Sequence, residues 1–150
     1  MFDEVKKILV PVDFSEPSRT ALRAACGIAR RYGAQITLLN VYQIPGFVYP
    51  DGFMPASPDT MRELIEQTET ALATQKASAE RDGVASVVTK ASEGAPFAEI
   101  LGEAEAGAYD LIVMGTHGRT GLSHTFLGSV AENVVRRALC PVLTVRPPKA

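Results

Sequence analysis

A glycine-spaced loop between an apolar run and a helix-like segment constrains the fold of this chain more than any other feature. Residues 111–114 are continuously apolar, as in a strand of a sheet that is covered on both faces. Residues 115–129 follow, and residues 130–138 then show helical periodicity. Glycines let the backbone approach an anion, and the first turn of a helix offers unpaired N–H groups and partial positive charge. We therefore expect a polyphosphate site here.

The spacing of this loop is Gly115-x2-Gly118-x9-Gly128-Ser129. It is not the motif G-x-x-x-x-G-K-[ST], because no lysine precedes a serine or threonine here. It is not G-x-G-x-x-G either, because Gly115 and Gly118 lie three residues apart. Gly128 and Ser129 stand where the helix should begin. A serine at that position can cap the helix or bind a phosphate oxygen.

This spacing, after a strand that ends in Val-Met-Gly, resembles the nucleotide-binding signature of the universal stress protein family. The resemblance spans nearly the whole chain. Residues 7–13 look like the first strand of the family with its terminal aspartate, residues 110–115 like the fourth strand and residues 140–146 like the last. It implies a cytoplasmic stress-response protein that binds ATP, with or without Mg²⁺, and hydrolyses it slowly or not at all.

Strand and helix patterns alternate along the chain, which predicts right-handed crossovers and a parallel sheet. The expected strands are residues 6–12, 35–41, 84–91, 109–114 and 141–145. Four helices are expected. The first follows the cap Ser15 and is stopped by Gly33, and the second follows the cap Ser57 and covers residues 58–81. The third and fourth cover residues 96–106 and 129–139. Without an internal repeat or linker, residues 1–150 should form a single α/β domain.

The fold class is thus a Rossmann-like, open, parallel five-stranded sheet with helices on both faces. The family resemblance implies the strand order 3-2-1-4-5, which has a switch point between the first and fourth strands. Ligands of open α/β sheets bind outside the carboxyl ends of the strands at such a point. The resemblance, read with the motif, assigns the nucleotide site to Pro11, Val12, Asp13, Val41, Met114, Gly115, His117, Gly118, Arg119, Gly128, Ser129 and Val130.

Two of these residues have alternative interpretations. Asp13 ends an apolar strand, where a carboxylate needs solvent or a partner, so it either caps the first helix or accepts hydrogen bonds from ribose hydroxyls. His117 and Arg119 either contact phosphate or serve, with a divalent metal, a phosphohydrolase or nucleotidyl-transferring enzyme. Because no nucleophile, acidic pair or metal-ligand set is visible around the histidines, we expect a binding module, with no catalytic residue and no protein metal site.

Residues 42–56 are too long for an ordinary connection and mix aromatic residues with proline and glycine. We expect a loop whose aromatic side chains cover the core beside the second strand, with a lid or a partner-binding patch as the alternative. In the helix that follows, the inner stripe should be Met61, Leu64, Ile65, Thr68 and Leu72.

Charge and composition narrow the possible partners. The net charge is −2 and the basic residues are scattered, which gives no footprint for nucleic acid. The acidic start and its short apolar run predict neither a signal peptide nor a membrane span. Two distant cysteines suit a reducing cytoplasm. For Cys140, we favour a packing role over redox sensing. The last strand, residues 142–146, should be a sheet edge, and the resemblance implies a homodimer through it.

Overall fold

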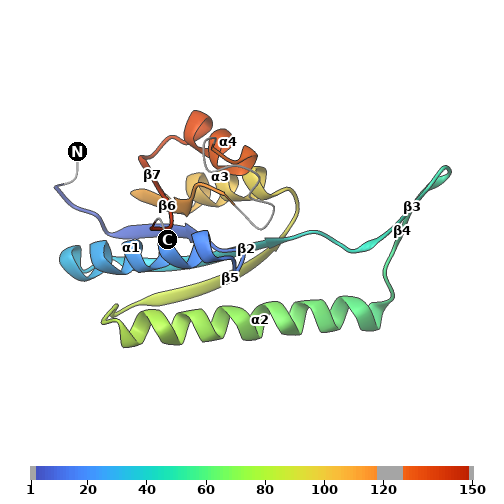
Figure 1. Cartoon of the computed structure of the whole chain (residues 1–150), viewed down its shortest axis with the longest axis horizontal. Coiled ribbons are helices and arrows are strands. Elements are labelled where there is room, and N and C mark those ends of the chain that lie inside the picture. Colours follow the sequence, from blue (N-terminus) through green and yellow to red (C-terminus); the bar gives the residue numbers. More distant parts are fainter. Residues whose placement is uncertain (1–2, 118–126, 149–150) are drawn as a thin grey trace.

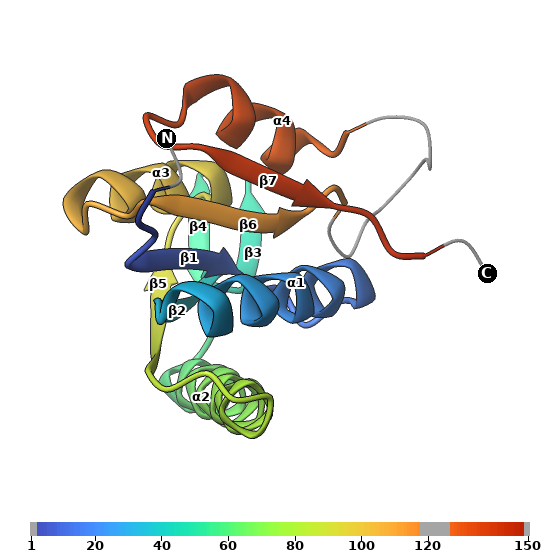
Figure 2. The ribbon, with the colours of Figure 1, turned by 90° about the vertical axis from the view of Figure 1, so that its left-hand side faces the viewer.

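The computed structural model describes residues 3–117 and 127–148 of the chain. Its main sheet has five strands, all parallel to their neighbours (Figures 1 and 2). They are β1 (Lys7–Pro11), β2 (Gln35–Tyr42), β5 (Val87–Glu93), β6 (Leu111–Gly115) and β7 (Val142–Val145). Their order across the sheet is β5-β2-β1-β6-β7. Numbered along the chain, these five strands run 3-2-1-4-5, so the expected topology is confirmed.

Helices cover both faces of this sheet, as Figure 2 shows. The helices are α1 (Glu16–Tyr32), α2 (Pro58–Arg81), α3 (Pro96–Ala106) and α4 (Ser129–Arg137). Successive side chains of a strand point to opposite faces, and β1 illustrates the result. Ile8 and Val10 pack with buried residues of α1 and α2, whereas Leu9 packs with those of α3 and α4. The sheet therefore has a separate apolar core on each face.

Local capping signals explain where two of the helices begin and one ends. The side chain of Ser15 accepts a hydrogen bond from the N–H of Ser18 at the start of α1, and Ser57 does the same for Thr60 at the start of α2. Gly33 ends α1 with φ 69°, a left-handed conformation that glycine adopts without a Cβ clash. These three positions match the expectations from the sequence.

The expected loop over residues 42–56 is wrong. This segment contains β3 (Gly46–Tyr49) and β4 (Gly52–Pro55), which pair antiparallel and project beyond the carboxyl edge of the sheet (Figure 1). We call residues 46–55 the arm. Its aromatic side chains do not cover the core, since Phe47 is 67% exposed and Phe53 is 53% exposed. Proline and glycine here shape the turn and the edges of a hairpin, a pattern that also occurs in irregular loops.

Other boundaries differ from expectation by a few residues. The expected strand from 84 begins only at Val87 and runs on to Glu93, although Val84 is buried in the core. The expected strand from 109 begins at Leu111, and the turn before it contains Ala108 with a positive φ of 50°. The expected helix to 139 ends at Arg137.

The inner stripe of α2 is only partly buried. Thr68 and Leu72 lie in the core, but Met61, Leu64 and Ile65 are half-buried. Figure 1 shows the reason, since the N-terminal half of α2 continues past the end of the sheet. Within residues 3–117 and 127–148, no helix combines the length and the apolar composition needed to cross a membrane.

Candidate functional site

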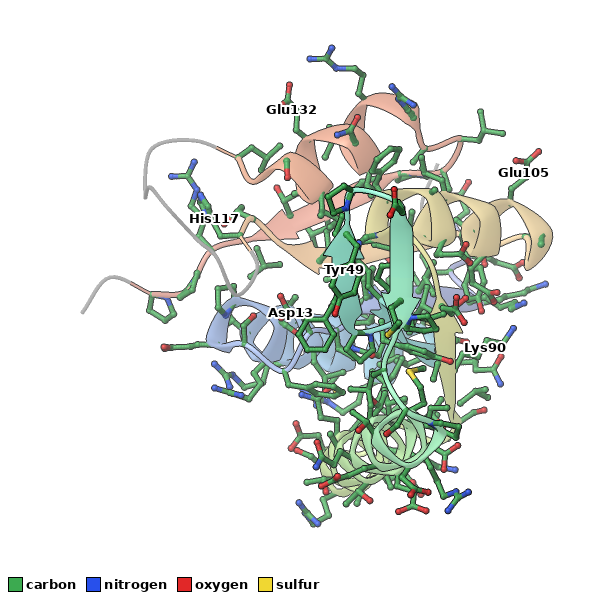
Figure 3. All side chains as sticks on the ribbon, turned by 90° about the vertical axis from the view of Figure 1, so that its right-hand side faces the viewer. Asp13, Tyr49, Lys90, Glu105, His117 and Glu132 are labelled. Carbon is green, nitrogen blue, oxygen red and sulfur yellow. The ribbon has the colours of Figure 1, made fainter. Side chains whose placement is uncertain are left out.

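The candidate site lies where β1 and β6 end side by side at the carboxyl edge of the sheet (Figure 3). The N–H of Val12 donates to the carbonyl of Leu39 over 2.8 Å, which extends the pairing of β1 and β2 past Pro11. The amide of Asn40, which is only 8% exposed, donates to the carbonyl of Val12 over 2.8 Å. These two bonds fix the backbone at the end of β1. Sequence reasoning overlooked Asn40, although a polar residue inside an apolar strand was a visible signal.

Asp13 anchors the first turn of α1. Its carboxylate accepts hydrogen bonds from the N–H of Ser15, over 3.0 Å, and from the Ser15 hydroxyl. The Ser18 hydroxyl accepts a bond of 3.2 Å from the N–H of Asp13. Between them, Phe14 has φ 65°, which is uncommon for a residue with a Cβ and costs on the order of 1 kcal/mol or more. The structure therefore shows the capping role in a modified form: Ser15 caps α1, and Asp13 holds Ser15 in place.

Gly115 lies against the first turn of α1. A Cβ at this position would stand 2.9 Å from the Cβ of Pro17 and 3.0 Å from its backbone carbonyl carbon and oxygen. Real Cβ atoms do not approach so closely, so glycine is required for the helix to pack on the end of β6. Packing alone accounts for the glycine at 115.

Gly128 closes the base of the loop between β6 and α4. Its N–H donates to the carbonyl of Thr116 over 2.7 Å, and a Cβ at 128 would meet that carbonyl oxygen at 2.9 Å. Its φ is −63°, so close approach explains the glycine here and a positive φ does not. Gly128 itself is the N-cap and Ser129 the first helical residue, as the expected start at 129 requires, so of the two roles considered for Ser129 the capping role is not the one found. No side chain in the described part of the chain caps α4.

His117 lies beside this helix start. The Cα of His117 would be 3.4 Å from a Cβ at Gly128. Its Nδ1 is 3.0 Å from the hydroxyl of Thr116, a residue that is only 3% exposed and that sequence reasoning overlooked. Its Nε2 is buried and has no hydrogen-bond partner within residues 3–117 and 127–148. A buried ring nitrogen without a partner is costly, which marks this position as one that suits a ligand.

The remaining expected site residues lie around the same edge or outside the described residues. Val41 is the last residue but one of β2, and its side chain packs against the core under α3 and α4, the core to which Met114 belongs and on which Val130 also packs. Pro11 pairs with Leu39 at the end of β1. The expectations for Gly118 and Arg119 fall on residues outside the described ranges.

Other reactive groups in the described residues do not form a second centre. No group of three or more His, Cys, Asp or Glu side chains that could hold a metal is present among them. Burial raises the pKa of the Cys26 thiol to about 11, with a further rise from the nearby Asp82 charge. Burial also raises the pKa of the Cys140 thiol. Both cysteines are therefore held in the less reactive thiol form.

These features define a class of protein: an open, doubly wound α/β domain with a glycine-spaced loop and a helix N-terminus at its switch point. Comparison with known proteins then gives the family. The model of the universal stress protein family matches residues 4–146, and the chain belongs to that family. The chain is 42% identical over 147 residues to the universal stress protein MJ0531 of Methanocaldococcus jannaschii, covering 96% of this chain and 84% of that protein.

Solved structures of the family have the same fold. The universal stress protein UspA from Lactobacillus plantarum superimposes with a TM-score of 0.81 at 27% identity, covering 95% of this chain and 99% of that one. The universal stress protein from Archaeoglobus fulgidus, solved in complex with dAMP, gives a TM-score of 0.66 at 25% identity and covers 93% of this chain and 96% of that one.

Proposed function

We propose that this chain is a cytoplasmic stress-response protein that binds an adenine nucleotide, preferentially ATP, in the crevice between the ends of β1 and β6. Two features that lie together carry the proposal. No described side chain caps the N-terminus of α4, and the Nε2 of His117 beside it is buried and has no hydrogen-bond partner among the described residues. Both are hydrogen-bond donors or potential donors, and phosphate oxygens are acceptors.

The geometry suggests a division of labour around the nucleotide. The phosphates would lie at the start of α4, where the first-turn N–H groups of Ser129 and Val130 and the ring of His117 can donate, with Gly118 and Arg119 completing the loop. The ribose would lie near Asp13, whose backbone position is set by the turn into α1. The adenine edge would meet the main chain of Val41 at the end of β2. The complex of the Archaeoglobus fulgidus relative with dAMP supports an adenine nucleotide as the ligand of the fold.

We further propose that the protein acts as a homodimer whose nucleotide state regulates its contacts. β7 is one edge of the sheet, and its pairing leaves the outer side of residues 142–146 available. Two such edges related by a two-fold axis would pair antiparallel. Neither nucleic acid nor a membrane is part of this proposal, since the chain has a slight net negative charge.

Hydrolysis should be slow or absent, because binding and orientation of the phosphates do not by themselves activate water. The rival function is a phosphohydrolase or nucleotidyl-transferring enzyme that uses His117 and Arg119 with a divalent metal. Turnover of ATP that requires Mg²⁺, exceeds the background rate and disappears in His117→Ala would favour the rival.

The first experiment identifies the ligand. Purified protein is denatured by heat, and the released small molecules are separated by chromatography. Calorimetric titration of the ligand-free protein with ATP, ADP and AMP, with and without Mg²⁺, then ranks the nucleotides. We expect ATP to bind most tightly. If none of the three nucleotides binds, the proposal is refuted.

A further inference from the structure

The arm carries large apolar side chains on both of its faces. Phe47 is paired with Met54 and Val48 with Phe53, and successive residues of a strand point to opposite faces. One face therefore presents Phe47 and Met54, which are 67% and 58% exposed, and the other presents Val48 and Phe53, which are 85% and 53% exposed. An apolar surface on both sides of a hairpin is unusual for a water-exposed element and marks an interaction site.

The arm also lacks the support that a hairpin needs. Its two strands form a sheet of their own, separate from the main sheet. A two-stranded hairpin is marginally stable in water unless its face packs against another element. The arm projects away from the other described elements (Figure 1), and every residue of β3 and β4 is exposed, so nothing in the described part of the protomer covers it.

The charges around the arm limit what can cover it. Between residues 43 and 57 the only charged residue is Asp51. Residues 58–67 of α2 carry Asp59, Glu63 and Glu66 and one cation, Arg62, which is paired with Asp59 at 3.5 Å. An arm that binds nucleic acid or an anionic membrane would need cations, and this one has none. The chemistry fits an apolar protein surface.

A matching surface lies at the base of the arm, on α2. Met61, Leu64 and Ile65 continue the stripe of the buried Thr68 and Leu72 at helical spacing, but they are only half-buried. None of residues 58–67 is buried. At 1.5 Å per residue, about 15 Å of amphipathic helix therefore extends past the sheet. We call Met61, Leu64 and Ile65 the open stripe.

We propose that the arm of one protomer packs on the open stripe of a second copy, and the reverse, around a two-fold axis. The arm and the open stripe lie next to each other in the molecule, since residues 56 and 57 alone separate β4 from α2. One axis therefore brings both pairs of surfaces together, as an isologous interface requires. The interface joins apolar side chains to apolar side chains and leaves the acidic residues of α2 at its rim.

This interface does not compete with pairing through β7. α2 packs against β5, and β5 and β7 are opposite edges of the main sheet. If both interfaces form and their two-fold axes meet at right angles, the assembly closes as a tetramer. If only the arm interface forms, it is a dimer. The arm interface uses none of the proposed nucleotide-site residues, so its test is independent of nucleotide binding.

The test measures mass in solution by light scattering and sedimentation. Phe47→Ser with Phe53→Ser removes the aromatic side chains of the arm at exposed positions. We expect this variant to have half the mass of the wild type. When Thr144→Pro is added to disrupt β7, the combined variant should have half the mass of the arm variant alone. Val135→Gln is the matched control, because Val135 is an exposed apolar residue, 47% accessible, on α4. It should leave the mass unchanged.

A cross-link tests the partner surface directly. In a Cys140→Ser background, one batch of protein carries Phe53→Cys and a second, tagged batch carries Leu64→Cys. After mixing and mild oxidation, we expect a disulfide between tagged and untagged chains, which a contact within one chain cannot give. An arm variant with wild-type mass in both backgrounds would overturn the proposal. So would an unchanged mass together with sedimentation of the wild type, but not of the arm variant, on phosphatidylcholine vesicles, because the occupant would then be lipid.

Discussion

The backbone N–H of Gly128 donates a hydrogen bond of 2.7 Å to the carbonyl oxygen of Thr116. This bond joins the residue that follows β6 to the residue that caps α4. The start of α4 is therefore held at the end of β6, which places its first N–H groups at the switch point of the sheet. The geometry of the proposed phosphate site therefore depends on that contact.

Gly128→Ala should weaken nucleotide binding and destabilise the fold together. Its Cβ would stand 2.9 Å from the Thr116 oxygen, which is backbone and cannot move aside cheaply. We expect at least a tenfold loss of ATP affinity, about 1.4 kcal/mol, and a loss of about 1–3 kcal/mol in the free energy of unfolding. Titration calorimetry and urea unfolding measure the two effects.

Gly102→Ala is the control for this variant. Gly102 lies on α3, where a Cβ would have no atom within 4 Å. Alanine is the better helix former, so the free energy of unfolding should rise by up to about 1 kcal/mol and ATP affinity should not change. Wild-type affinity in a folded Gly128→Ala protein would show that nucleotide binding does not depend on the Gly128–Thr116 contact.

Asp13 can be tested with two substitutions that separate its roles. Asp13→Ala removes the acceptor for the Ser15 N–H and should cost about 1 kcal/mol of stability. Asp13→Asn keeps an acceptor oxygen there and should remain close to wild-type stability. If the carboxylate also binds ribose hydroxyls, both variants should lose several-fold in ATP affinity. Melting curves with and without ATP decide, and an Asn variant with the full ATP-induced shift would contradict the ribose role.

The sequence predicted the frame of the fold well, because local signals determine it. The bounds 58–81 and 96–106 agree with α2 and α3, and caps at Ser15, Ser57 and Gly33 are set by nearby backbone groups. The strand order was accessible only through the family resemblance, because periodicity does not encode which strands are neighbours.

What the sequence did not predict depends on contacts between distant segments. The need for glycine at 115 comes from Pro17, which belongs to another element. The partial burial of Met61 follows from the sheet ending before the N-terminal half of α2, and no pattern within the helix contains that information (Figure 1). The arm was mistaken for a loop because its aromatic, proline and glycine residues suit both structures equally.

A cluster of Lys90 on β5, Glu103 on α3 and the neighbouring Tyr109 predicts how the free energy of unfolding depends on pH. Glu103 accepts hydrogen bonds from Lys90, over 2.7 Å, and from the Tyr109 hydroxyl, over 2.8 Å. Burial, the largest single cause, raises the pKa of Glu103, but these two bonds and the charge of Lys90 together outweigh it and leave the pKa below its usual value. Ionisation of Glu103 thus favours the folded state.

Because the folded pKa of Glu103 is depressed, its contribution to stability is fully present above the pKa of the unfolded carboxyl, roughly 4.3, and is lost as the pH falls through the folded value. Glu103→Gln should therefore be less stable than the wild type at pH 7, and the difference should shrink on acidification below about pH 4. Urea unfolding of both proteins from pH 7 to pH 3 measures this. A difference that stays constant over the range would show that the ionisation of Glu103 does not stabilise the fold.

The edge strand β7 gives the last prediction. The N–H of Ile112 donates to the carbonyl of Pro141 and the N–H of Thr116 to that of Val145, so alternation turns the backbone groups of Thr144 away from β6. Thr144→Pro removes an outward N–H and leaves the pairing with β6 in place. If two chains pair through this edge, the variant should have half the mass of the wild type in light scattering, with a modest loss of stability.

A charged variant tests the same edge by another route. Val142 packs against the core under α3 and α4, so a lysine there would also disturb the fold. Leu143 is 40% exposed, and Leu143→Lys places like charges close together across the two-fold axis at little cost to the core. Both variants should bind ATP as the wild type does, because the proposed site lies at the ends of β1 and β6. If both keep the wild-type mass at low micromolar concentration, the chains do not associate through β7.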